Sequence, residues 1–136
     1  MLPDREQGLG DEQATTKTIL LVEDDPYISS FLEEAIEQET PYRAIIATDS
    51  HAALKLVQHF TPCLFILDYG LPDMNGIELY DRLHSNRALA PIPAILITAN
   101  RQIPQQQLQQ RQLITFRKPF DLDPFLATIE NLLASA

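Results

Sequence analysis

Four polar side chains stand where short apolar runs of the chain end: Asp24, Asp68, Thr98 and Lys118. Apolar runs of about four to eight residues between turn-forming residues are typical of buried strands. We therefore expect the four groups to project from one edge of a parallel sheet, where open α/β folds bind their ligands. Two carboxylates, a hydroxyl and an ammonium group at such an edge indicate metal-assisted phosphoryl chemistry.

The elements that must position these groups alternate along the chain. The apolar runs predict five strands, at residues 19–22, 43–47, 63–67, 94–97 and 113–117. Apolar residues at helical spacing after each run predict five helices. Asp25 and Asp123, each followed by proline, are typical of a helix cap and the first helical residue, and Asp49 or Ser50 can cap the second helix.

Two of these helices have a distinct composition. In the first, Phe31 and Leu32 belong to an apolar series at helical spacing. The fourth, at residues 104–112, is rich in glutamine, and only Leu108 is clearly apolar. This pattern predicts a polar helix with a small buried face.

Five strands alternating with five helices indicate the α/β class, because parallel strands need crossover connections. The expected fold is a flavodoxin-like (βα)5 doubly wound parallel sheet with strand order 2-1-3-4-5. Its switch point lies between the first and third strands, so Asp24 and Asp68 should border the same crevice. Residues 1–16 lack apolar periodicity and are expected to form a flexible leader, followed by one folded domain at residues 17–136.

Composition excludes several classes of function. The formal net charge of −9 argues against direct binding of nucleic acid, since that affinity comes from basic groups on phosphates. Cys63 is the single cysteine, so we expect no disulfide framework and a reducing compartment. No apolar stretch approaches the roughly 18 residues that span a bilayer. The expected location is the cytoplasm, without membrane insertion.

Each candidate also has a plainer interpretation. Glu23, Asp24 and Asp25 could complement the positive end of the following helix, and Asp25 is a good cap. Asp68 could be a turn residue, Thr98 could simply end its strand, and Lys118 could be solvated. Their common placement at the ends of strands favours the functional interpretation. The three histidines lack metal-ligand spacing, and we expect surface or partly packed positions for His51, His59 and His84.

With these residues in place, the sequence resembles the receiver domain of two-component response regulators from Thr16 to Leu133. The matching pieces are Glu23 and Asp24 after an apolar strand, Asp68 followed by Leu71, Pro72 and Gly76, the pair Thr98 and Ala99, and Lys118 with Pro119. The resemblance implies that Asp68 is a nucleophile that accepts a phosphoryl group from a phosphohistidine.

The resemblance also implies a Mg²⁺ site. Asp24 and Asp68 would bind the ion through carboxylates, Gly70 through its backbone carbonyl, and Glu23 through water. These are the hard oxygen ligands that Mg²⁺ prefers, and the cation would allow the anionic groups to approach each other.

The remaining site residues would act on the phosphoryl group. By resemblance, Lys118 would pair with one phosphoryl oxygen and the Thr98 hydroxyl would donate to another. The backbone amides of Tyr69 and Ala99 would complete the cradle. The bond between Lys118 and Pro119 is expected to be cis.

The family switches through the Thr98 counterpart and an aromatic ring three residues before the lysine. That position is Thr115 here, and the adjacent Phe116 should point to the opposite side of its strand, because side chains alternate. The segment between Thr98 and Lys118 is also short and contains Pro104 and many glutamines, so we expect a short or mobile fourth helix and unusual partner recognition there. Gly70 and Asn100 occupy the positions that tune phosphate lifetime in the family.

The sequence thus predicts a receiver that accepts a phosphoryl group on Asp68 with Mg²⁺ and thereby switches protein–protein interactions. Its donor would be a sensor histidine kinase or a phosphotransfer protein, and no output domain is expected in this chain. It would be no enzyme beyond its own aspartyl phosphorylation and dephosphorylation. A phosphorylation-independent interaction module is the alternative. A haloacid-dehalogenase-like phosphatase is weaker, because Gly70 stands where a second acid is required. The downstream partner and a homodimer are left open.

Overall fold

The five apolar runs form five parallel strands of one sheet. A computed structural model describes residues 17–100 and 102–134, so the leader predicted for residues 1–16 lies outside the described residues. The strands are β2 (Thr18–Val22), β3 (Arg43–Ala47), β4 (Leu64–Asp68), β5 (Ala94–Thr98) and β6 (Ile114–Arg117). Their order is β3-β2-β4-β5-β6, and every neighbouring pair is parallel. The predicted order 2-1-3-4-5 is confirmed.

A helix follows each strand, as the alternation predicted. The helices are α2 (Pro26–Glu39), α3 (Ser50–Leu56), α4 (Gly76–His84), α5 (Gln105–Arg111) and α6 (Leu122–Ala134). None of the helices in the described ranges is long and apolar enough to cross a membrane.

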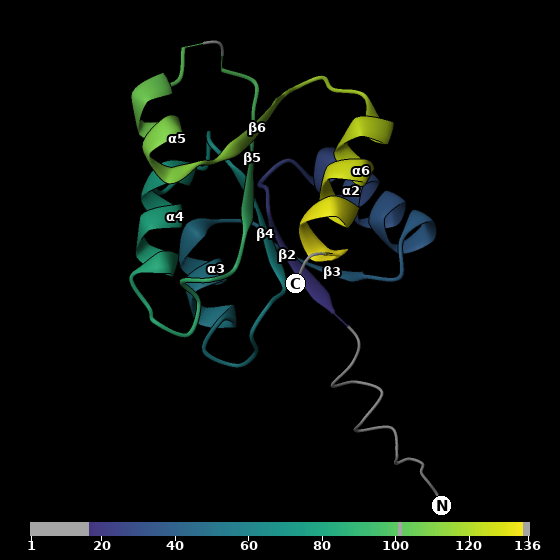
Figure 1. Cartoon of the computed structure of the whole chain (residues 1–136), viewed down its shortest axis with the longest axis horizontal. Coiled ribbons are helices and arrows are strands. Elements are labelled where there is room, and N and C mark those ends of the chain that lie inside the picture. The colour runs from purple at the N-terminus through teal and green to yellow at the C-terminus, as the bar shows by residue number, and fades with distance from the viewer. Residues whose placement is uncertain (1–16, 101, 135–136) are drawn as a thin grey trace, which may run out of the picture.

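The helices cover both faces of the sheet (Figure 1). On one face, α3, α4 and α5 pack over strand residues such as Leu20, Phe65 and Leu96. On the other, α2 and α6 pack over the alternating set, which includes Leu21 and Ile66. The central strands bury side chains toward both faces, which explains why they are continuous apolar runs in the sequence.

The first two helix caps agree with the prediction, and the last does not. The Asp25 side chain accepts hydrogen bonds from the backbone N–H groups of Tyr27 and Ile28, and Asp49 caps α3 through the N–H of Ala52. By contrast, α6 begins at Leu122, so Asp123 lies within its first turn instead of capping it. An acidic side chain there still complements the positive end of the helix.

The first helix buries a narrower stripe than its sequence suggested. Leu32 and Ile36 are fully buried, whereas Phe31 is 58% exposed. Consecutive helical residues are rotated by about 100° around the axis, so Phe31 lies beside the stripe that Leu32 occupies. The apolar series in the sequence therefore covers more of the helix surface than the part that is buried.

The fourth predicted helix is short, as expected. It spans seven residues, and Leu108 is its buried residue. Its cap, Gln112, takes the left-handed conformation with φ of 55°, which turns the chain back into β6. A single apolar anchor explains why this segment has so polar a sequence.

Candidate metal and phosphoryl site

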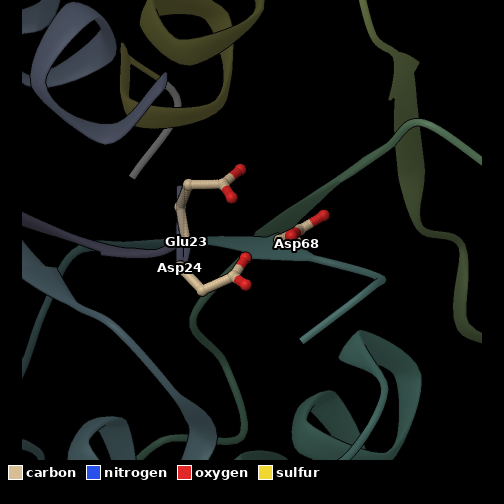
Figure 2. A group of neighbouring side chains, drawn as sticks. All are labelled: Glu23, Asp24 and Asp68. Carbon is tan, nitrogen blue, oxygen red and sulfur yellow. The ribbon is translucent and has the colours of Figure 1, made fainter. Parts of the chain in front are cut away.

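Three carboxylates meet at the carboxyl edge of the sheet. Glu23 and Asp24 directly follow β2, and Asp68 is the last residue of the neighbouring strand β4. One ligand oxygen from each lies within 4.8 Å of the others. Figure 2 shows the three side chains gathered there. The predicted placement of Asp24 and Asp68 beside one crevice is confirmed, with Asp68 inside its strand instead of just after it.

Glu23 is the most deeply buried of the three acids. It is 1% exposed, and its Oε2 accepts a hydrogen bond of 3.0 Å from the backbone N–H of Asp25. Its Oε1 accepts one of 2.7 Å from Nζ of Lys118. Burial raises the pKa of Glu23, and the two hydrogen bonds oppose that rise. The buried carboxylate is thus held by one ammonium group and one amide.

Lys118 reaches two of the three acids of the site, Glu23 and Asp68. Its Nζ lies 3.3 Å from Oδ1 of Asp68 as well as 2.7 Å from Oε1 of Glu23. Burial alone would lower the pKa of Lys118, but the hydrogen bond to Glu23 and the charge of Asp68 raise it overall. The lysine is therefore a charged ammonium group that faces the carboxylate of Asp68.

Asp68 is enclosed but retains a polar environment. It is 5% exposed, and its Oδ1 also accepts a hydrogen bond of 3.3 Å from the backbone N–H of Gly70. A buried carboxylate without such partners would be costly. The ammonium group of Lys118 and this amide offset that cost while leaving the other carboxylate oxygen, Oδ2, outside these two contacts.

Thr98 and Lys118 are linked through the backbone. The N–H of Lys118 donates to the Thr98 carbonyl at 2.7 Å, continuing the pairing of β5 with β6. The Lys118–Pro119 peptide bond is cis, as the resemblance implied. Thr98 is buried, and its Oγ1 accepts a hydrogen bond of 2.9 Å from the N–H of Asn100. Its hydroxyl thus bonds within its own loop.

The two backbone amides of the predicted cradle differ. Ala99 is exposed at the rim of the crevice that holds Asp68 and Lys118. The N–H of Tyr69 instead donates to the carbonyl of Ile97 at 2.8 Å. The amide that contacts Asp68 in this structure belongs to Gly70.

A close packing contact explains why the first residue of α4, Gly76, is a glycine. A Cβ atom on Gly76 would lie 2.7 Å from the backbone oxygen of Asp68 and 2.7 Å from Cδ1 of Leu96. Real Cβ atoms do not approach so closely, so only glycine lets α4 begin here. The capping box of Asn75 and Glu78 then fixes the start of the helix. The sequence shows that a glycine stands at this position, but its close contact with Asp68 becomes evident only in the folded structure.

The donor set suits a hard divalent cation. Three carboxylates from adjacent strands offer oxygen ligands, and the described residues place no cysteine or histidine among them. Mg²⁺ binds through one or two carboxylates and keeps several waters, which accords with Asp24 being exposed while Glu23 and Asp68 are buried. The residues present therefore fit the predicted ion.

An apolar groove adjoins the acidic crevice and was not predicted. The combined cavity measures about 710 Å³ and extends from Asp68 and Lys118 to Tyr27, Phe31 and Phe120. Tyr27 is 86% exposed and Phe31 58%. The four-residue spacing of these two aromatics, which places them on one side of a helix, was the available signal.

The switch position has the geometry that alternation predicted. Phe116 packs against Phe120 and Phe125 on the α6 face. Thr115 faces the other way and lines a second cavity beside α5. The prediction that Phe116 points away from the position of Thr115 is confirmed.

Comparisons with known proteins agree with this geometry. The family model described as "Response regulator receiver domain" matches residues 19–130. The chain is 28% identical over 120 residues to "Response regulator Rre1" of Synechocystis sp. (strain ATCC 27184 / PCC 6803 / Kazusa), covering 86% of this chain and 52% of that protein. It thus spans about half the length of this curated relative.

Two solved structures illustrate the structural likeness. A CheY-like response regulator receiver domain protein from Methanospirillum hungatei JF-1 has a TM-score of 0.81 at 25% identity, covering 89% of this chain and 96% of that one. The response regulator TrrA from Thermotoga maritima, in complex with Mg²⁺ and BeF, has a TM-score of 0.77 at 26% identity, covering 87% and 100%. Fold, site geometry and family model agree: this chain belongs to the response regulator receiver domain family.

Proposed function

We propose that this receiver accepts a phosphoryl group on Asp68 and that the modification switches its interactions with other proteins. The observation that carries the proposal is the position of Asp68. Its carboxylate lies at the end of β4, inside the acidic cluster and 3.3 Å from the ammonium group of Lys118. A carboxylate beside a fixed cation and further acids is suited to in-line phosphoryl transfer.

In this mechanism an oxygen of Asp68 attacks the phosphorus of a phosphohistidine. The new O–P bond forms as the N–P bond breaks, and the electron pair of that bond leaves with the donor imidazole. Lys118 compensates charge on the transferred group, and the Thr98 hydroxyl, which donates only a long bond of 3.5 Å to the carbonyl of Asn100, can turn to donate to that group instead. Water later attacks the phosphorus and releases inorganic phosphate, so the protein catalyses only its own modification and hydrolysis.

Glu23, Asp24, Asp68 and the carbonyl of Gly70 would hold Mg²⁺, which supplies positive charge against the negative charge that accumulates during transfer. Glu23 also holds Lys118, so this residue has a second task beside the metal. The response regulator TrrA from Thermotoga maritima was solved in complex with Mg²⁺ and BeF, which supports a Mg²⁺ site in this receiver.

The phosphoryl donor would be a histidine kinase or a phosphotransfer protein. A donor protein must bring its histidine to Asp68 through the open crevice. The apolar groove of Tyr27, Phe31 and Phe120 borders that entrance and offers hydrophobic area for docking. We also propose a cytoplasmic location, which the single cysteine supports.

Intact-mass measurement tests the proposal directly. The protein is incubated with Mg²⁺ and a small phosphodonor such as acetyl phosphate, beside Asp68→Asn and the surface control Asp81→Asn. We expect one added phosphoryl group on the wild type and on Asp81→Asn, and none on Asp68→Asn. Equal labelling of all three proteins would remove Asp68 as the acceptor. No labelling of any would favour the phosphorylation-independent interaction module.

A further inference from the structure

The loop between β4 and α4, residues 69–75, carries a proposed metal ligand that has no side chain. Gly70 would contribute its backbone carbonyl, and a Cβ atom at this position would meet no other atom within 4 Å. Its N–H donates a bond of 3.3 Å to Oδ1 of Asp68. Because Gly70 has no side chain to pack, the position of its carbonyl depends on the residues that anchor the rest of the loop.

Backbone bonds and one apolar side chain anchor the near part of this loop. The N–H of Tyr69 donates to the carbonyl of Ile97 at 2.8 Å, and the N–H of Gly76 donates to the carbonyl of Tyr69 at 3.0 Å. Leu71 is 8% exposed and belongs to the core cluster that also contains Ala53 of α3. These contacts fix the base of the loop and Leu71, and a further contact holds its far part.

Asp73 joins the far part of the loop to the start of α3. Its Oδ1 accepts a hydrogen bond of 3.0 Å from the backbone N–H of Ser50, and its Oδ2 accepts one of 3.0 Å from the backbone N–H of His51. Nδ1 of His51 lies 2.6 Å from the same Oδ2. The Asp73 side chain is 19% exposed and that of His51 is 69% exposed. Solvent therefore screens the imidazole contact, and the two backbone amides form the sheltered part of the link.

Two aspartates from different loops thus share the first turn of α3. Asp49, directly before the helix, accepts from the N–H of Ala52, whereas Asp73 serves Ser50 and His51 from 23 and 22 positions away. The first N–H groups of a helix have no partner within the helix, so they depend on such acceptors. Burial alone would raise the pKa of Asp73, but its hydrogen bonds with Ser50 and His51 lower it overall. The contact with α3 therefore favours the charged carboxylate.

We propose that Asp73 is a positioning residue for the metal site, which ties the loop to α3 and thereby keeps Gly70 where its carbonyl can serve as a ligand. This inference rests on the function proposed above, because Gly70 is a metal ligand only in that proposal. Asp49 caps the same helix from outside the loop, so losing its cap should weaken α3 without displacing Gly70. By linkage, binding of Mg²⁺ should in turn stabilise the contact between Asp73 and α3.

A Mg²⁺ titration of the full chain, followed by amide NMR, compares Asp73→Ala with Asp49→Ala. Both variants lose a cap of α3 and should show a lower urea midpoint. Groups that orient metal ligands affect metal affinity, so the dissociation constant should rise about 10-fold in Asp73→Ala and change less than about 2-fold in Asp49→Ala. Equal Mg²⁺ affinity in the two variants would overturn the proposal, because they share the loss of a cap and differ in the loop.

Two milder variants separate the parts of the link. Asp73→Asn keeps one acceptor oxygen and should lose less affinity for Mg²⁺ than Asp73→Ala. If Asp73→Ala does not fold, wild-type affinity in Asp73→Asn would overturn the proposal. His51→Ala removes the imidazole but keeps the backbone amide, so the affinity should change less than about 2-fold. A loss in His51→Ala as large as that in Asp73→Ala would overturn the assignment to the backbone contacts.

Hydrogen exchange provides a readout that needs no activity. The amides of Ser50 and His51 bond to Asp73, so their protection reports this contact directly. Mg²⁺ should increase that protection in the wild type and in Asp49→Ala, and should not change it in Asp73→Ala. The amide of Thr40, at the end of α2, is the internal control. Unchanged protection of Ser50 and His51 in a wild type that binds Mg²⁺ would overturn the link.

Labelling by acetyl phosphate separates this inference from the proposed function. At saturating Mg²⁺ the rate for Asp73→Ala should return to within about 2-fold of the wild type, because Asp68 and Lys118 are unchanged. A rate that stays low at saturating Mg²⁺ would overturn a role through the metal. A wild type that binds Mg²⁺ and is labelled, beside an Asp73→Ala that binds Mg²⁺ equally well, would overturn this inference alone. A wild type that neither binds Mg²⁺ nor gains mass would overturn the proposed function and this inference with it.

Discussion

Nζ of Lys118 lies 2.7 Å from Oε1 of Glu23. The carboxylate is almost fully buried, and the lysine directs its ammonium group from Glu23 toward Asp68. A long flexible side chain is thereby fixed before any phosphoryl group arrives, which is the preorganisation that electrostatic catalysis requires. The relationship makes Glu23 a positioning residue for the lysine as well as a candidate ligand.

Replacing Lys118 should both slow the phosphorylation of Asp68 and lower the stability of the fold. Lys118→Met leaves two buried carboxylates without their cation, and in Mg²⁺-free buffer we expect a loss of about 2 kcal/mol in the free energy of unfolding. Labelling by acetyl phosphate should slow by about 100-fold. Urea unfolding and intact mass measure the two effects. Lys17→Met, at an exposed residue, is the control, and equal behaviour of the two variants would contradict the role of the pair.

Metal binding should depend on the exposed acid of the cluster. Asp24→Asn removes one charged oxygen ligand without disturbing the buried pair, so the dissociation constant for Mg²⁺ should rise about 10-fold or more. Tyrosine emission can follow the titration, because the chain has no tryptophan and Tyr69 adjoins Asp68. Asp121→Asn serves as an exposed acidic control. Removal of Mg²⁺ with EDTA should stop labelling in the wild type.

The two glycines that follow β4, Gly70 in the loop and Gly76 at the start of α4, should respond differently to an added methyl group. Gly76→Ala brings Cβ to 2.7 Å from the backbone oxygen of Asp68, and we expect a loss of about 2 kcal/mol in stability. Gly70→Ala meets no atom within 4 Å and should change stability by less than about 0.5 kcal/mol. Thermal unfolding measures the difference in stability between the two variants. A similar melting temperature for both variants would refute the packing argument.

A pH dependence should arise where α4 meets α5. Arg111 contacts Asp81 through two hydrogen bonds of 2.7 and 2.8 Å, and this lowers the pKa of Asp81. A carboxyl whose pKa is depressed on folding stabilises the protein above its unfolded pKa of about 3.9, and this contribution is lost as the pH falls through the folded value.

At about pH 6, Asp81→Asn should cost about 0.5 kcal/mol, because the acid is half-exposed and solvent screens the pair. The difference from wild type should shrink on acidification below about pH 4, as measured by urea midpoints. Asp121→Asn, outside this pair, is the control. A difference that stays constant down to the acid transition would show that the pair has no electrostatic role.

The apolar groove beside Asp68 should affect the rate of phosphoryl transfer only when the donor is a protein. Phe31→Ala removes an exposed aromatic ring and should slow transfer from a phosphorylated donor protein about 10-fold, since aromatic anchors dominate interfaces. Labelling by acetyl phosphate, which needs no docking surface, should stay unchanged. Ile114→Ala truncates another exposed apolar side chain, on β6, and serves as the control. Equal slowing with both donors would point to damage at the site itself.

The local sequence determined much of the fold of this protein and the placement of two of its site residues. Short continuous apolar runs between turn-forming residues are typical of strands buried on both faces, and their alternation with amphipathic segments indicates a parallel sheet. The carboxyl ends of such strands share one edge, so Asp24 and Asp68 had to meet. The cap at Asp25 followed from short-range hydrogen bonding, and the opposite directions of Thr115 and Phe116 followed from strand alternation.

Only the tertiary structure decided the relationships between distant residues. Lys118 and Glu23 are 95 positions apart, and no local pattern predicts that their side chains join. The exposure of Phe31 depends on how much of α2 the sheet covers, and helix periodicity alone leaves that width open. The start of α6 at Leu122 overrode the local cap signal of Asp123. The cavity at Thr115 arises from how α5 packs over β6, because empty volume is a property of packed neighbours and not of a sequence.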